Sequence, residues 1–185
     1  MQIEGGTGTG YKAGVDSHNR LTTLATIQSS IHHASQFHGL AFGWTAVSAA
    51  LAGNDTALLV CNTDPERSLH IDSIYIYSDT PTQVKIHFPA YNASFTGTAV
   101  TGLNMNRTSN IVALATAYAD ETANALVAAN TILTLATNEL TGDQFGIMVR
   151  DMNGIILGYH DSIAVDVVAG AAAFECTIWG YYVED

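Results

Sequence analysis

From Thr56 onward, apolar residues come in short runs at intervals typical of β-strands, and this pattern constrains the fold more than any other feature of the chain. Side chains on a strand point alternately to its two faces, so a half-buried strand carries apolar residues at every second position. Over residues 84–88 the alternation predicts three core-facing side chains: Val84, Ile86 and Phe88. It predicts that Lys85 and His87, which lie between them, face water.

Further strand signals follow along the body. Apolar runs cover residues 56–62 and 69–77, and alternating patterns cover residues 133–135, 145–149, 163–167 and 172–183. The last pattern has bulky apolar residues on both faces, which predicts a central strand or one covered by a neighbouring subunit. About eight strands separated by short turns predict an antiparallel β-sandwich of jelly-roll type.

Two segments give more local predictions. Asn153-Gly154 separates the apolar runs 145–151 and 155–160. Because Asn-Gly accepts the positive φ angles of a type I′ turn, we expect a hairpin there. Residues 114–130 are rich in alanine, which favours a helix by propensity, and we expect a short helix or an ordered loop in this segment.

The opening of the chain has a different texture, with five glycines between Gly5 and Gly14 followed by the polar segment 15–21. Glycine loses more backbone entropy on folding than any other residue, so such a segment becomes ordered only where another surface fixes it. We therefore predict a docking arm over residues 1–20, an extended connector with one or two strands over residues 21–55, and a sandwich body over residues 56–185.

The charge balance limits the classes of partner. Charged residues make up 12% of the 185 residues, and the formal net charge is −11 with only six Lys+Arg. So low a charged fraction, about half the usual share, predicts that extra surface is buried in an oligomer or on a partner. The negative sign argues against direct binding to nucleic acid or to anionic membranes. We expect no secretory signal and no membrane span, because the sequence lacks apolar runs of the required kind.

No motif predicts a catalytic, cofactor or metal site, and we do not expect an enzyme. The glycines of residues 6–10 have no strand before them and no helix after them, which a dinucleotide-binding loop requires. His32, His33 and His38 form a cluster without a neighbouring carboxylate, which we interpret as part of a polar connector rather than a metal site.

The remaining reactive groups also have ordinary interpretations. Asp143, Asp151 and Asp161 lie near predicted strand ends and are interpreted as solvated loop residues, with adventitious calcium as the alternative. Cys61 and Cys176 lie in strand-like runs, where we expect buried free thiols, with a single disulfide as the alternative.

Four short motifs lie along the chain: the Val-Asp-Ser-His-Asn-Arg-Leu segment 15–21, Asn62-Thr63 followed by Leu-His-Ile at 69–71, the Leu-Asn-x-Asn-Arg-Thr-Ser-Asn segment 103–110, and the closing Trp-Gly-Tyr at 179–181. Together they resemble a diffuse family of tailed-bacteriophage virion proteins. The resemblance implies a jelly-roll or related β-sandwich that oligomerises, commonly as trimers. It implies a place on the capsid exterior or near the neck and tail, after synthesis in the cytoplasm of the bacterial host.

The resulting hypothesis is a capsid decoration, or cement, protein on the outer surface of the virion. Its arm would bind the major capsid protein by strand addition, through Gly8, Gly10, Tyr11, Lys12, Val15, Asp16, Asn19 and Arg20. Trp179, Tyr181 and Tyr182 are predicted to lie in the interface of a homo-oligomer, expected to be a trimer. The alternatives are a neck, tail or fibre-base protein with the same body, and a carbohydrate-binding module with an exposed aromatic platform.

Overall fold

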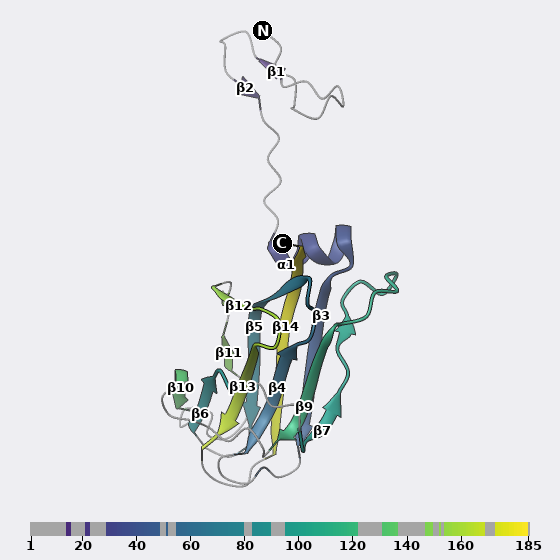
Figure 1. Cartoon of the computed structure of the whole chain (residues 1–185). Helices are drawn as coiled ribbons and strands as arrows, with labels where there is room; N and C mark the ends of the chain where they lie inside the picture. The colour runs from purple at the N-terminus through teal and green to yellow at the C-terminus, as the bar shows by residue number, and fades with distance from the viewer. Residues whose placement is uncertain are drawn as a thin grey trace.

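Two antiparallel sheets face each other in the computed structural model (Figure 1). The structure describes residues 14–15, 21–22, 29–48, 51, 55–79, 83–89, 95–121, 131–136, 147–149, 152, 154–168 and 173–184. The first sheet, called the β4 sheet, has the strand order β10 (Thr131–Ala136), β6 (Gln83–His87), β13 (Ser162–Val167), β4 (Thr56–Asn62), β9 (Ala115–Glu121) and β7 (Thr98–Val100).

The second sheet, called the β14 sheet, is built around the last strand of the chain. Its order is β11 (Ile147–Val149), β5 (Arg67–Ser78), β14 (Phe174–Glu184), β3 (Ala41–Ser48) and β8 (Leu103–Asn104), and β12 (Ile155–Leu157) also pairs with β5. Every strand pair in both sheets is antiparallel. The prediction of an all-β antiparallel sandwich is therefore confirmed.

The core lies between the sheets and is filled by the alternate residues that the sequence pattern indicated. The β14 sheet contributes large side chains that are almost fully buried: Phe42, Trp44, Ile74, Ile76, Phe174 and Ile178. The β4 sheet contributes a facing set: Leu58, Val60, Val84, Ile86, Ile163 and Val165. Burial of each such side chain contributes about 1.5–3 kcal/mol to the free energy of folding. This apolar layer is therefore the main favourable contribution to the packing of the two sheets.

The connector predicted over residues 21–55 needs correction. Residues 30–38 are helical: α1 (Ser30–His33) continues into the π-helical turn η1 (Ala34–His38), and Gly39 ends it with a left-handed φ of 64°. The Ser29 hydroxyl caps α1 by accepting a hydrogen bond from the His32 N–H. β3 then pairs with β14 over its whole length, so residues 41–48 belong to the body.

The helix or loop expected within residues 114–130 is also wrong in its described part. Residues 115–121 form β9, which pairs with β4 on one side and with β7 on the other. Alanine favours a helix in isolation, but two flanking strands offer backbone partners along the whole segment and override that preference.

The hairpin predicted at Asn153-Gly154 is not formed. β11 and β12 do not pair with each other, because both pair antiparallel with β5, at residues 74–76 and at residues 69–71. The register of β5 against β14 shifts between Ser73 and Ile71, which leaves Asp72 as an extra residue. The Asp72 carbonyl accepts a hydrogen bond from Met152 N–H at this bulge, so the strand beside β5 is interrupted there.

The outward face of β6 differs from its prediction as well. Val84 and Ile86 are buried as expected, but His87 is also fully buried and Phe88 is exposed. His87 Nε2 lies 2.8 Å from Asp166 Oδ2 on the neighbouring β13. The Thr56 hydroxyl donates to the other carboxylate oxygen of Asp166 at 2.6 Å. His87, which the sequence pattern predicted to face water, is thus enclosed together with Asp166 and Thr56 from two other strands.

A small third sheet lies near the start of the described sequence. β1 (Gly14–Val15) pairs with β2 (Leu21–Thr22), Gly14 opposite Thr22 and Val15 opposite Leu21. The two ends of the 15–21 motif are therefore joined by a strand pair. Neither strand is hydrogen-bonded into the two large sheets.

Cys61 and Cys176 are buried free thiols, as predicted. Burial raises the pKa of Cys61 to about 11, and it also raises the pKa of Cys176. The thiolate is the reactive form of cysteine. We expect the folded protein at pH 8 to react with a thiol reagent at least tenfold more slowly than the protein unfolded in guanidinium, as measured by absorbance.

The same shift has a consequence for stability. The folded-state pKa of Cys61 lies above its ordinary value of 9.0, so this thiol stabilises the folded state fully below pH 9 and loses that contribution as the pH rises toward 11. In the labelling experiment described above, rapid reaction of both thiols in the folded protein at pH 8 would contradict the burial of Cys61 and Cys176.

Candidate interaction surface

The outward face of the β14 sheet carries aromatic and small polar side chains with very little charge. Three rows cross it, and their members pair directly: Leu103, Gly43, Trp179 and Ser73; Thr45, Thr177 and Tyr75; Val47, Glu175 and Tyr77. Glu175 is the only charged residue in these rows. Val47 and Leu103 are 69% and 62% exposed, so apolar side chains on this face are open to solvent.

Next to this face, residues 103–114 lead away from β8 along the side of the sandwich. Two asparagine side chains fix the start of this segment. Asn104 Nδ2 donates to the carbonyls of Gly39 and Ile111, and Asn106 Nδ2 donates to the carbonyl of Ser35. The segment is thereby tied to η1 and closed upon itself. Such bonds replace the regular ladder that a loop lacks.

The remaining polar groups of this segment are used in the same way. Asn104 Oδ1 accepts from the Asn106 N–H, and Asn106 Oδ1 accepts from both the N–H and the hydroxyl of Thr108. Ser109 Oγ accepts from the Ile111 N–H. The side chains of Asn104, Asn106, Thr108 and Ser109 therefore bond within the protein and help to fix the shape of the loop.

The large apolar side chains of this segment are exposed to solvent. Five of the eleven large hydrophobic side chains that are exposed among the described residues lie here: Leu103, Met105, Ile111, Val112 and Leu114. Phe37 of η1, the element to which Asn106 is bonded, is exposed as well. We call residues 103–114 the 103–114 surface. An ordinary surface loop exposes polar side chains and turns apolar ones inward, whereas this segment does the reverse. Exposed apolar patches of this kind mark interaction sites.

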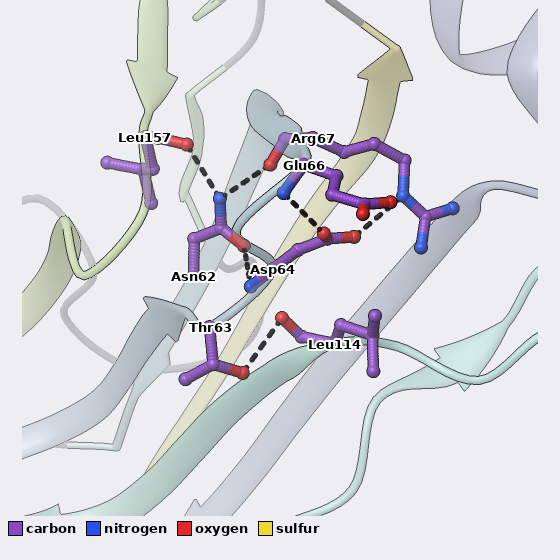
Figure 2. Close-up of polar contacts among 7 residues, drawn as sticks. All are labelled: Asn62, Thr63, Asp64, Glu66, Arg67, Leu114 and Leu157. Atoms are coloured by element: carbon purple, nitrogen blue, oxygen red, sulfur yellow. Dashed lines mark hydrogen bonds and ion pairs between the residues drawn. The ribbon is translucent and has the colours of Figure 1, made fainter.

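The far end of the 103–114 surface is held by the turn between β4 and β5 (Figure 2). The Thr63 N–H and hydroxyl both donate to the carbonyl of Leu114, each at 3.0 Å. Thr63 follows Asn62, whose buried side chain makes three hydrogen bonds: Nδ2 donates to the carbonyls of Arg67 and Leu157, and Oδ1 accepts from the Asp64 N–H. The turn is thus fixed to three segments of the chain.

Asp64 and Arg67 complete this turn. The Arg67 Nε donates to Asp64 Oδ2 at 2.6 Å, and the other carboxylate oxygen accepts from the Glu66 N–H (Figure 2). The Arg67 guanidinium lies 5.4 Å from the ring centre of Tyr182. Burial raises the pKa of the Tyr182 hydroxyl, and the Asp64 carboxylate raises it further. Each charge has its partner here, so we assign the cluster to support of the turn.

A shallow pocket of about 230 Å³ lies where the 103–114 surface meets the outward face of the β14 sheet. Its lining combines residues from four segments: Ile31, Asp72, Ser73, Met105 and Trp179. The bulge in β5 places Asp72 at this site. The pocket joins the two exposed regions into one continuous surface.

The predicted interface residues of β14 have different positions. Trp179 is half-buried on the outward face. Tyr182 is buried against Phe42 in the core, and Tyr181 is buried beneath Ala34 of η1. Trp179 is therefore the residue of the three that is available to a second subunit, and its role in an oligomer stays a prediction.

The predicted arm residues are described only in part. Val15 lies in β1, whereas Gly8, Gly10, Tyr11, Lys12, Asp16, Asn19 and Arg20 lie outside the described residues. The 103–114 surface was not among the predicted site residues. Its sequence carries the signal, because Arg107 is the only charged residue between Gly97 and Ala119 although apolar residues occur throughout.

The histidine cluster lies on α1 and η1, where the ring centres of His33 and His38 are 5.2 Å apart. Within the ranges that the structure describes, no three His, Cys, Asp or Glu side chains gather in a way that would hold a metal ion. No helix in the same ranges has the length and apolar character needed to cross a membrane.

Comparison of the chain with known protein families, with curated proteins and with solved structures finds no match.

Proposed function

We propose that this chain is a structural protein of a tailed-phage virion, and that it decorates the outer capsid surface as a cement protein. The observation that carries the proposal is the continuous surface of the β14 sheet and residues 103–114, which is mainly apolar and aromatic and carries only Asp72, Arg107 and Glu175 as charged residues. Such a surface suits permanent assembly, because interface cores are depleted of charged residues and enriched in aromatic ones.

The proposed fold within the sandwich is a jelly roll. Eight strands in chain order are β3, β4, β5, β6, β10, the β11–β12 pair, β13 and β14. When these eight strands are numbered in chain order, the first, eighth, third and sixth lie side by side in one sheet. The second, seventh, fourth and fifth lie side by side in the other sheet. This arrangement of two Greek keys supports the jelly-roll assignment, an architecture used by viral capsid and lectin domains. In this view β7, β8 and β9 are an addition between the fourth and fifth strands.

The proposed role of residues 1–20 is to anchor the body to the major capsid protein. Support comes from the glycine-rich sequence, which gains order only on a partner, and from Lys12 and Arg20 in an otherwise acidic chain. Several such arms on one oligomer would act together through effective concentration, so individually weak contacts would give firm attachment to the shell. The shell would gain resistance to internal pressure without any chemical reaction.

The test is cosedimentation with capsids of the phage that encodes the chain. We expect the full-length chain to bind these capsids to saturation, and a variant lacking residues 1–20 to bind at least tenfold more weakly, because the remaining contacts no longer act together. The matched control is a Glu66→Gln variant of the full-length chain, because Glu66 is exposed in the β4–β5 turn. Binding is measured by densitometry of the pellet.

Each result decides one part of the proposal. Equal binding by the truncated chain would overturn the role of the arm. Failure of both proteins to bind would overturn the cement function and leave the neck or tail position and glycan binding to be tested. The glycan-binding alternative is supported by Trp179, Tyr75 and Tyr77, which are partly exposed on one face.

A further inference from the structure

We infer that the 103–114 surface binds a second copy of this chain, on the outward face of that copy's β14 sheet. This inference extends the oligomer part of the proposed function by naming the two surfaces that meet. The contact is made twice when a twofold axis relates the two copies, and it closes a ring when it repeats head-to-tail with a rotation that fits.

Charge is the first argument for a second copy. With a formal net charge of −11, two copies repel each other over most of their surface. They can approach where carboxylates are scarce. Residues 97–119 contain no Asp or Glu, the three rows on the β14 sheet contain only Glu175, and the pocket between them adds only Asp72. These two regions are therefore suited to meet each other.

Charge complementarity is the second argument. The 103–114 surface carries one charged side chain, the exposed cation Arg107, and the facing rows carry one exposed anion, Glu175. A contact between the 103–114 surface of one copy and the β14 sheet of the other can place these opposite charges together. A contact of either surface with its own copy would instead place like charges together, and like charges across an interface select against that arrangement.

The rigidity of the 103–114 surface is the third argument. Asn104 and Asn106 hold the start of the segment to η1, and Thr63 holds its end at Leu114. Because the loop is already fixed, little conformational entropy is lost on binding. Its five exposed apolar side chains can be buried against a second copy, and exposed apolar patches often mark interaction sites.

The test uses the purified full-length chain without capsids, with the mass measured by light scattering during size-exclusion chromatography. We expect an oligomer, and we expect Val112→Asp to weaken it at least tenfold, because Val112 is 70% exposed and the charge would have to be buried at the contact. The matched control is Tyr159→Asp, since Tyr159 is 55% exposed in the turn between β12 and β13, outside both surfaces. Circular dichroism establishes that both variants are folded.

A charge exchange tests the partner surface. Arg107→Glu and Glu175→Arg are each expected to weaken the oligomer, and the combined variant is expected to restore it, because the opposite charges again face each other. A monomeric wild-type chain, equal dissociation by Tyr159→Asp, or no recovery in the combined variant would overturn the inference. A stable oligomer that fails to bind capsids would instead count against the cement function alone.

Discussion

Replacing Asp166 with alanine is expected to lower the free energy of unfolding by about 2–5 kcal/mol, because each buried polar partner left unsatisfied costs about 1–3 kcal/mol. Asp166 is fully buried on β13 and accepts a hydrogen bond from the Thr56 hydroxyl. Its second oxygen lies 2.8 Å from His87 Nε2, and His87 is fully buried as well. The substitution would leave the buried Thr56 hydroxyl without its acceptor and would remove the carboxylate oxygen beside the buried His87.

The measurement is urea unfolding followed by fluorescence and by circular dichroism. Thr56→Val removes only the hydroxyl and is expected to cost about 1 kcal/mol, so it gives a second reading if the alanine variant does not fold. The exposed Glu66→Ala variant is the control, with an expected change within about 0.5 kcal/mol. A loss below 1 kcal/mol for Asp166→Ala would show that the carboxylate contributes little to the folded state.

The second large effect is expected at Asn62. Asn62→Ala should lower the free energy of unfolding by about 2–4 kcal/mol, because three hydrogen bonds are lost and their partners stay at least partly buried. Those partners are the carbonyls of Arg67 and Leu157 and the N–H of Asp64. The side chain joins the end of β4 to β5 and β12, so its removal would loosen three strands together.

Hydrogen exchange separates this local effect from global destabilisation. The Asp64 amide donates to Asn62 Oδ1 and should lose protection in the variant, whereas the Glu66 amide donates to Asp64 and should lose less. The exposed Asn110→Ala variant is the control for stability. Equal loss of protection at both amides would mean that the whole turn depends on Asn62.

The sequence indicated the sheets wherever a strand alternates cleanly between core and solvent. β13 follows the pattern with Ile163, Val165 and Val167, and β14 is central to its sheet, which explains its apolar bulk on both faces. The pattern failed where a distant segment decides the environment. His87 is buried because Asp166 and Thr56, from two other strands, surround a position that the pattern assigns to water.

Backbone partners caused the other differences. β9 is a strand because β4 and β7 flank it, and neither neighbour can be inferred from an alanine-rich segment. β11 and β12 lie end to end because a single extra residue, Asp72, interrupts the strand that both of them join. The 103–114 surface has no strand or helix period, so only its lack of charge distinguishes it from an ordinary loop.

The position of β14 between β3 and β5 also constrains how the protein is made. β3 and β5 each pair with β14 along most of their length, and they do not pair with each other. During synthesis both strands leave the ribosome more than 90 residues before residue 174, so their long unpaired edges must wait for the last strand. Folding that depends on such distant pairing is slow and exposed to aggregation. For this chain, the β14 sheet is completed only after residues 174–184 have been made.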